Sequence, residues 1–588
     1  MCAWGGAGGS EMNFAVALLS LRIIFAAPQN LLFIVVDDLR TELGVYGHGG
    51  LVSSPNIDKL AARGVTFSRA YCQYTLCSPS RTAFLTGMRP DRTRLWEIGP
   101  YFREQTANAT AIVTLPQALK AAGYNATGAG KVWHPGTSSG GDGKWCGGNC
   151  GGDDQPYSWS YPVPAGVDPR VLFWECDAGP NTTGVSARVW GLPGAQGCIT
   201  SDACVQCLES YNVTTPRSWI AAPCDDACFV DSLVSSRVAA DLAGKGAAAV
   251  GGGAAPWALF AGFKRPHLGF AVPQWALDAQ PLHPPLAALR APPPGFPPSG
   301  WSGNGEINSY PDAGREGVAN ATFPGMLRDE AHAPLRRAYY AAVRWVDSQI
   351  GAVLDALDAA GLSESTWVVL TGDHGWSLGE HGSWAKVTLF ETTARVPLII
   401  APPRGAAGWK TNATVGPEGI VEHLDMYPTV LDVLGVAGGV PQGQLNGASL
   451  APLLREGGGG GSGKNFSVAL TQVMRGVEPG RRCNNHPPAG GEGAEPTCAM
   501  GVSIRVPGWR FTQWVGFNYG NKSAPAAPIW GDLRGEELYD HRVDDAAAGG
   551  ADPNNNFDVS EVVDVAGDPQ FSAVKKALAA QLRAAWAQ

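Results

Sequence analysis

Two apolar segments of strand length, each ending in acidic residues, limit the folds open to this chain. Residues 31–38 read LLFIVVDD, and residues 367–374 read WVVLTGDH. Continuously apolar strands are typical of parallel sheets that helices cover on both faces. Parallel strands end at a common edge, where α/β proteins build their sites. The two segments therefore predict an α/β sheet with acidic side chains gathered at one edge.

The polar residues that follow these strands have the chemistry of a cation site. Three carboxylates at one edge would repel each other unless a cation joins them. Oxygen ligands favour calcium or magnesium, and an imidazole also suits transition metals. An ordinary acidic turn after each strand is the alternative. The expected cation ligands are Asp37, Asp38, Asp373 and His374.

The size and charge of the chain restrict the class of protein. With 588 residues it is long enough for a large core and two domains. A content of 45% hydrophobic and 16% charged residues indicates a soluble globular protein. The net charge of -9 argues against nucleic acid as a partner. A small basic pocket can still bind a polyanionic substrate in an acidic protein.

Thirteen cysteines are many for a cytosolic enzyme and ordinary for a secreted one. Most of them fall in a Gly- and Trp-rich segment, residues 137–235, which predicts a disulfide-stapled insertion. A zinc site is the alternative, because Cys204 and Cys207 have the spacing of zinc ligands. Cys483 and Cys498 form a second local pair. The cysteines of the insertion are Cys146, Cys150, Cys176, Cys198, Cys204, Cys207, Cys224 and Cys228.

Several features point to the secretory pathway, with a lysosome-like compartment or the exterior as the destination. The apolar run 14–21 predicts a signal segment over residues 1–27, and no other stretch is long enough to span a bilayer. Asn-x-Ser/Thr sequons spread along the chain predict a glycoprotein. The sequons begin at Asn108, Asn125, Asn181, Asn212, Asn320, Asn412, Asn465 and Asn521.

A short motif around Cys77 carries the functional signal. Pro79 suits the first turn of a helix and Gly87 ends the helix-compatible run, so a short helix is expected to begin at Cys77. A helix N-terminus offers free N–H groups and the positive end of a dipole to an anion. Taken alone, a cysteine in a secreted chain is more often half of a disulfide. Cys72, nearby, has no obvious mate.

The segment 77–87, CSPSRTAFLTG, resembles the signature of the sulfatase family. In that family a formylglycine-generating enzyme oxidises the cysteine to formylglycine during synthesis. The resemblance extends from about Asn30 to about Asp540 and is closest to the iduronate-2-sulfatase branch. It implies an alkaline-phosphatase-like sulfatase fold, in which helices sandwich a large mixed, mostly parallel sheet and a smaller C-terminal α+β subdomain follows. The expected bounds are 28–454 for the catalytic domain and 465–588 for the subdomain.

The resemblance also implies roles for basic residues. In the run GKVWHPG, Lys131 would contact formylglycine and sulfate, and His134 would serve as the base. In the run KRPH, His267 would contact the sulfate or the leaving oxygen, and Arg265 stands where the closest relatives carry lysine. Such an exchange keeps the charge but changes its geometry. Lys386 matches the family lysine that holds the sulfate.

The implied chemistry is the hydrolysis of a sulfate ester. The hydrated aldehyde would supply the nucleophile, and a cation with Lys131, Lys386 and Arg81 would neutralise the non-bridging sulfate oxygens. A thiol or a serine lacks the aldehyde's route to release the bound sulfate. The resemblance implies calcium in preference to magnesium. Its ligands would be Asp37, Asp38, Asp373, His374 and the formylglycine derived from Cys77.

The choice of substrate rests on two further segments. Residues 86–96 and 376–386 look like the iduronate-2-sulfatase branch and imply a sulfated uronic-acid polysaccharide, with Arg92 or Arg94 as a carboxylate contact. The long insertion departs from that branch and leaves another sulfated glycan or a small sulfate ester open. A phosphatase or phosphonate hydrolase of the same superfamily is a further alternative. A catalytically silent glycan-binding protein would be expected to have lost site residues, and none is lost.

The rest of the chain predicts regular elements around this site. Apolar residues at three- and four-residue spacing predict an amphipathic helix over 335–357. Residues 271–330 are rich in proline and glycine and are expected to form a loop, and the glycine run in 455–463 a hinge. Further helices are expected at 420–434 and 573–587. Strands are expected at 257–263, 396–400, 468–473, 501–506, 509–517 and 537–540.

Overall fold

The structure of the chain is a computed structural model, and most of the chain between residues 29 and 587 is described. The described residues are 29–106, 111–140, 153–154, 157–160, 204, 207, 218–250, 255–287, 289–303, 306–310, 327–436, 438–457, 466–476, 498–518, 526–543 and 561–587. The expected signal segment, most of the expected hinge and much of the insertion lie outside these residues.

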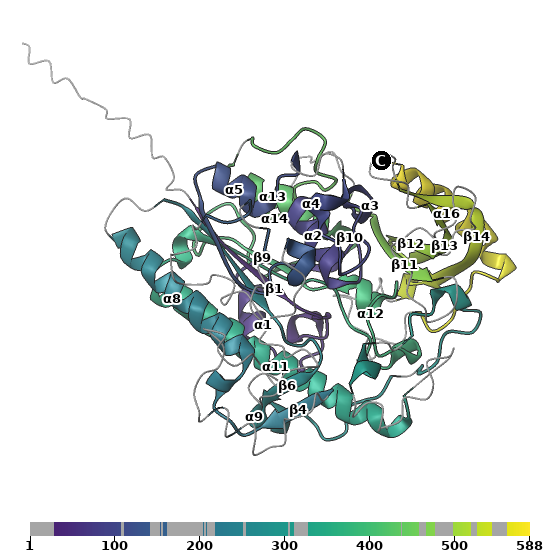
Figure 1. The fold of residues 1–588 in the computed structure, drawn as a ribbon, viewed down its shortest axis with the longest axis horizontal. Helices are drawn as coiled ribbons and strands as arrows, with labels where there is room; N and C mark the ends of the chain where they lie inside the picture. The colour runs from purple at the N-terminus through teal and green to yellow at the C-terminus, as the bar shows by residue number, and fades with distance from the viewer. Residues whose placement is uncertain are drawn as a thin grey trace, which may run out of the picture.

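A large mixed sheet forms the centre of the molecule, as Figure 1 shows. Its strands follow the order β10-β2-β9-β7-β1-β5-β3, and β8 pairs with β2. β1 runs parallel to both neighbours, β5 and β7, while β9 is antiparallel to β2 and β7. The strands are β1 Asn30–Val36, β2 Val65–Tyr71, β3 Asn125–Gly130, β5 Trp257–Phe263, β7 Thr366–Gly372, β8 Arg395–Val396, β9 Leu398–Ala401 and β10 Ala413–Glu422.

Helices cover both faces of this sheet, and β1 shows why. Its alternate side chains enter two separate cores: Leu32 and Ile34 join one, whereas Leu31 and Phe33 join the other. The first core is closed by α1, α8 and α11, and the second by α2, α5 and α13, on the opposite side of the sheet in Figure 1. The predicted sandwich is confirmed. These helices are α1 Pro55–Ala61, α2 Cys77–Thr86, α5 Leu115–Ala121, α8 Val230–Val250, α11 Asp329–Ala359 and α13 Met426–Val433.

A smaller antiparallel sheet with one helix forms the C-terminal part, drawn in light green and yellow in Figure 1. Side chains of this sheet and of the helix α16 share a third hydrophobic core. This is the α+β subdomain that the sequence predicts. Its elements are β11 Ala469–Gly476, β12 Cys498–Val506, β13 Trp509–Asn518, β14 Ala527–Asp540 and α16 Ser572–Trp586.

The structure corrects one helix and adjusts several bounds. The helix expected over 420–434 is wrong in its first part, because Ile420 to Glu422 end β10 and pair with β2. The helix begins only at Met426. The strand expected over 396–400 is interrupted at Pro397, between β8 and β9. Proline has no N–H to donate to a ladder, which explains the break. Short helices complete the fold: α3 Pro90–Thr93, α4 Phe102–Gln105, α9 Gln274–Asp278, α12 Glu391–Ala394 and α14 Ala451–Leu454.

The loop expected over 271–330 contains a little regular structure at its start. Strand β6, Phe270–Pro273, pairs in parallel with β4, Trp219–Ala222, to form a separate two-stranded sheet. The single-turn segment η7, Ile307–Ser309, lies near the end of the described part of this loop. Ile307 is fully buried and belongs to the core that α11 closes.

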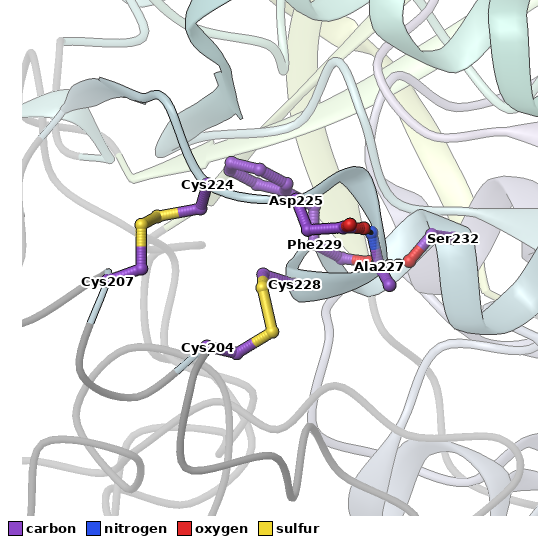
Figure 2. Close-up of a disulfide and its surroundings, with 8 residues drawn as sticks. All are labelled: Cys204, Cys207, Cys224, Asp225, Ala227, Cys228, Phe229 and Ser232. Carbon is purple, nitrogen blue, oxygen red and sulfur yellow. Dashed lines mark hydrogen bonds between the residues drawn. A yellow bond between two sulfur atoms is a disulfide. The ribbon is translucent and has the colours of Figure 1, made fainter.

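Two disulfides cross-link the last part of the insertion to the segment just before α8, as Figure 2 shows. They join Cys204 to Cys228 and Cys207 to Cys224, so the alternative of a zinc site at these sulfurs is excluded. Cys498 is also disulfide-bonded. Its expected partner Cys483, like Cys146, Cys150, Cys176 and Cys198, lies outside the described residues. Among the described helices, none has the length and apolarity needed to cross a membrane.

Candidate active site

The acidic ends of β1 and β7 meet at one edge of the sheet. The two strands are parallel neighbours with Val36 opposite Gly372, so the residues that follow them are adjacent. The Asp373 Oδ1 atom accepts hydrogen bonds from the backbone N–H of Asp38 at 3.0 Å and of His374 at 2.9 Å. Asp38 adopts φ 59°, a left-handed conformation that aspartate tolerates better than most residues. We call Asp37, Asp38, Cys77, Asp373 and His374 the edge cluster.

Helix α2 brings Cys77 to the centre of the edge cluster. Leu76 precedes the helix in extended conformation, and Gly87 ends it with φ 68°, as the motif predicts. The Cys77 Sγ atom lies 3.3 Å from His374 Nε2 and 3.5 Å from Asp37 Oδ1. Burial, with Asp37 adding to it, raises the pKa of the Cys77 thiol well above its ordinary value. The unmodified side chain is therefore a thiol and a weak nucleophile.

The edge cluster has the donor set of a divalent cation site. Single ligand atoms of Asp37, Asp38, Cys77 and His374 all lie within 4.8 Å of one another. Asp373 is outside this set: its Oδ1 atom accepts two backbone hydrogen bonds, and its Oδ2 atom, which accepts from Arg81, has a second lone pair. Buried carboxylate oxygens at this spacing are the ligands that a hard cation such as calcium prefers.

Arg81 lies beneath this cluster and is fully buried. Its Nε atom donates to Asp373 Oδ2 at 2.9 Å, and its NH2 group donates to Asp37 Oδ1 at 3.0 Å. Its NH1 group donates to the backbone carbonyls of Lys131 and Val132. The guanidinium fork thus holds two carboxylates from two different strands. Arg81 therefore holds the carboxylates of Asp37 and Asp373 in position.

Two lysines lie beside Cys77, one in the segment after β3 and one in the segment after β7. Lys131 follows β3, and its Nζ atom donates to Asp37 Oδ2 and lies 3.9 Å from Cys77 Sγ. Lys386 follows β7, and its Nζ atom donates to Asp38 Oδ1 at 3.1 Å and lies 3.5 Å from the same sulfur. Burial raises the pKa of Asp37, but Lys131 and other nearby cations lower it more, to well below its ordinary value. Two ammonium groups, each paired with a carboxylate, therefore lie beside the thiol.

The two histidines that the sequence singles out, His134 and His267, differ in their hydrogen-bond partners. The Nδ1 atom of His134 lies 3.0 Å from the Pro135 carbonyl oxygen, which accepts from an N–H, so the neutral ring keeps its lone pair on Nε2. His267 has an acceptor at both nitrogens: the Leu268 carbonyl at 2.6 Å and a Glu306 carboxylate oxygen at 3.1 Å. Burial lowers the pKa of His267, but nearby carboxylates outweigh it, and the pKa is raised. His267 is a cationic donor.

The sequence did not single out Glu306. Its Oε1 atom lies 3.3 Å from Lys386 Nζ as well as 3.1 Å from His267 Nε2. Burial raises its pKa, but Lys386 and His267 lower it below its ordinary range, so the group is a carboxylate. It sits in the loop expected over 271–330, where no motif or periodicity marks any residue. Only its buried neighbour Ile307 offers a signal, an isolated apolar residue in a polar run.

The structure separates the arginines that the sequence considered. Arg92 donates to the backbone carbonyls of Gln444 at 2.8 Å and Gly443 at 2.9 Å, so its guanidinium is committed to a turn. Arg94 lies over the ring of Trp96 with 5.7 Å to the centroid and is only half-buried. Arg265 donates to the backbone carbonyls of Ala271 and His267. It therefore shapes the loop that carries His267.

Comparison with known proteins agrees with this geometry. A model of the family described as Sulfatase matches residues 29–436. Iduronate 2-sulfatase of Mus musculus is 30% identical over 90% of this chain and 92% of its own length, and that of Homo sapiens is 30% identical over 83% and 85%. A solved structure of a 2-O GAG sulfatase has a TM-score of 0.57 at 20% identity, covering 95% of this chain and 91% of that one. The chain belongs to the sulfatase family and is a sulfuric ester hydrolase.

Proposed function

We propose that this sulfatase removes sulfate from a uronic-acid-containing glycan, using a formylglycine made from Cys77 and a bound calcium ion. One observation carries the proposal: a single buried sulfur is faced by two lysines, an imidazole and a carboxylate at distances of 3.3 to 3.9 Å. A nucleophile, a cation site and positive charge for an anionic substrate thus share one point. This is the set of groups that sulfate ester hydrolysis requires.

The cation and the aldehyde would supply chemistry that the unmodified side chains lack. Calcium would act as a Lewis acid that polarises the ester oxygens, and a hydrated aldehyde would offer a hydroxyl nucleophile in place of the thiol. The residues that would hold the cation are Asp37, Asp38, Asp373, His374 and the modified Cys77. Arg81 would keep Asp37 and Asp373 oriented toward it, and we place Arg81 there rather than against the sulfate.

The chain's own side chains would bind the sulfate and move its protons. Lys131 and Lys386 would hold the non-bridging oxygens, because their ammonium groups bracket the position of Cys77. His267 is a protonated donor and suits the leaving oxygen, which needs a proton as the ester bond breaks. His134 keeps a lone pair on Nε2 and suits the removal of a proton from the nucleophile. The two histidines would therefore act as acid and base respectively.

The substrate class follows from the relatives and from one arginine. The two iduronate 2-sulfatases cover most of this chain at 30% identity, which supports an iduronate-like sugar sulfated at a ring hydroxyl. A uronic acid carries a carboxylate that needs a cation. Arg92 or Arg94 would make that contact: the Arg92 guanidinium donates to backbone carbonyls, and Arg94 lies over the ring of Trp96.

We propose the secretory pathway as the route, with a lysosome-like compartment or the exterior as the destination. The two disulfides need an oxidising environment to form and persist. The sequon asparagines Asn125 and Asn412 are exposed, as glycan attachment requires. The other sequons lie outside the described residues. A formylglycine-generating enzyme would act on the chain in the same pathway.

Mass spectrometry of one tryptic peptide tests the nucleophile. Cleavage after Arg69 and Arg81 releases residues 70–81, which contain both Cys72 and Cys77. Cys72 is a buried free thiol and serves as an internal control. After denaturation and alkylation, we expect one alkylated cysteine at position 72 and formylglycine or its hydrate at position 77. Alkylation at both positions, in protein made in its own secretory pathway, would reject the formylglycine proposal.

Turnover assays test the substrate. We expect release of inorganic sulfate from a 2-O-sulfated iduronate disaccharide, and none from the Cys77→Ala variant. A phosphate monoester or phosphonate monoester cleaved faster than any sulfate ester would support a phosphatase or phosphonate hydrolase instead.

The Arg94→Met variant should raise KM for the uronate substrate and leave KM for an aryl sulfate unchanged, because only the former carries a carboxylate.

A further inference from the structure

Glu306 holds the two cationic groups that we assign to the substrate. One carboxylate oxygen, Oε1, lies 3.3 Å from Lys386 Nζ and 3.1 Å from His267 Nε2. The second nitrogen of His267 is engaged with the Leu268 carbonyl, so Nε2–H is the donor that the substrate's oxygen would need. Glu306 therefore contacts the same two donors that the proposed function assigns to a sulfate ester.

Exposure places Glu306 on the solvent side of these groups. Its side chain is 26% exposed, against 18% for His267 and 3% for Lys386. An anion that enters from solvent meets Glu306 before it reaches Lys386. The next residue, Ile307, is fully buried in the core, which anchors the backbone on that side of Glu306. A glutamate has three side-chain torsions and can swing outward while its backbone stays in place.

Glu306 and a sulfate ester carry the same charge, so one can replace the other beside Lys386 and His267. A sulfate monoester is a monoanion with oxygen acceptors, as is a carboxylate. Lys386 already pairs with Asp38, so a sulfate beside Glu306 would add a further anion to the same two cations and would be repelled by Glu306. Substrate binding would then release Glu306 toward solvent, and its return would favour the departure of the product.

We propose that Glu306 is an internal competitor for the sulfate position: it binds Lys386 and His267 in the resting enzyme and displaces inorganic sulfate after turnover. The inference rests on the proposed function, because that function assigns Lys386 and His267 to the sulfate. Glu306 is a regulatory residue of the binding site rather than a participant in bond cleavage.

Binding of inorganic sulfate to the full chain tests this inference. We expect the Glu306→Gln variant to bind sulfate about tenfold more tightly than the unchanged chain in calorimetry, a gain of about 1.4 kcal/mol. The matched control is Glu364→Gln, which removes the same charge from an exposed residue. Glu364 precedes β7, and the edge cluster lies at the other end of that strand. This control should leave the affinity for sulfate unchanged. Glu306→Asp, which keeps the charge, should bind sulfate more weakly than Glu306→Gln.

Steady-state kinetics give a second readout. In Glu306→Gln, KM and the inhibition constant of sulfate should both fall, and kcat should fall if release of sulfate limits turnover. Equal or weaker sulfate binding by Glu306→Gln would overturn the inference, because it would mean that Glu306 supports the cations instead of competing for them. Equal thermal unfolding midpoints of the variants exclude misfolding as the cause.

The calorimetry separates this inference from the proposed function. It needs no turnover and can be repeated in the Cys77→Ala background. Tighter sulfate binding by Glu306→Gln without hydrolysis of any sulfate ester would reject the function and keep the competitor. Hydrolysis of sulfate esters with unchanged sulfate affinity in Glu306→Gln would keep the function and reject the competitor.

Discussion

Two buried clusters of charged residues in this molecule contain similar residue types but have different roles. The edge cluster joins β1, α2 and β7 around Cys77. The second cluster joins α12 of the main domain to the C-terminal sheet, and we call it the subdomain cluster. Each offers carboxylates and a histidine with ligand atoms within 4.8 Å of one another. The subdomain cluster consists of Glu391, Arg505, Arg510, His541 and Glu561.

The partners of the carboxylates distinguish the two clusters. In the subdomain cluster, Arg510 donates to Glu391 Oε1 at 2.5 Å and to Glu561 Oε1 at 2.6 Å, and Arg505 donates to Glu391 Oε1 at 2.9 Å. Each of these side chains is at most 5% exposed. Two guanidinium groups satisfy these two carboxylates and repel a cation, whereas in the edge cluster one guanidinium, Arg81, bonds two carboxylates of a larger acidic set. What sets the edge cluster apart is therefore the thiol and the two lysines beside its acidic residues.

The largest expected effect comes from the centre of the edge cluster. Cys77→Ala should lower kcat/KM by roughly a thousandfold or more, because it removes the residue that we propose as the precursor of the nucleophile. Its free energy of unfolding should stay within about 1 kcal/mol of the unchanged chain, because the neighbouring ion pairs remain. Sulfate release and urea unfolding measure the two quantities. A stability loss of several kcal/mol would show that Cys77 is structural, like the subdomain cluster.

The opposite pattern is expected for Arg510. Arg510→Met leaves buried carboxylates without their fork and should lower the free energy of unfolding by about 3 to 5 kcal/mol. kcat/KM of the folded fraction should not change. The control is Arg542→Met, whose exposed guanidinium pairs with Asp540 and should leave the unfolding midpoint unchanged. Loss of turnover in folded Arg510→Met would contradict the division of roles.

Chelation of the cation tests which of the two clusters binds metal. Chelation should abolish turnover and lower the free energy of unfolding by about 2.7 kcal/mol relative to calcium at a hundredfold excess over its dissociation constant. Calcium should restore both, and magnesium should do so less well. Asp37→Asn should remove the calcium-dependent shift, whereas Glu561→Gln should keep it. Loss of the shift in Glu561→Gln would place the cation in the subdomain cluster.

The smallest effect is a dependence of stability on pH. Burial raises the pKa of Glu561 from 4.5 to about 8, although Arg510 opposes it. The stabilisation from this group is fully present below pH 4.5 and is lost as pH rises through about 8. Burial lowers the pKa of His541 below 6.5, so its contribution varies only below that value. Burial also raises the pKa of Glu537 to about 7, so only the difference between the unchanged chain and a Glu561 variant reports Glu561.

Urea unfolding at several pH values between 6.5 and 8.5 measures this slope. The unchanged chain should lose stability with rising pH more steeply than Glu561→Gln, by at most about 1.4 kcal/mol per pH unit. Glu364→Gln, at an exposed position, should behave like the unchanged chain. Identical slopes for Glu561→Gln and the unchanged chain would show that this carboxyl is ionised in the folded protein at neutral pH.

Much of the fold follows from local patterns in the sequence. The apolar run before Asp37 is β1, and the amphipathic helix expected over 335–357 is α11, which begins earlier at Asp329. The helix expected over 420–434 is wrong at its start for a clear reason. Ile420 and Val421 have apolar spacing that suits a helix, but they pair with Arg69 and Ala70 of β2. That partner lies some 350 residues away, out of reach of any local pattern.

The sequence by itself determined the ends of the buried strands and the helix at Cys77, because hydrophobic periodicity, proline and glycine act over a few neighbouring residues. Only the tertiary structure decided that Glu306 reaches Lys386 and His267, that Arg81 holds two carboxylates, and that the subdomain cluster is closed. These contacts join residues far apart in the chain, and none leaves a repeat or a motif. Their geometry follows from how the layers pack around the sheet.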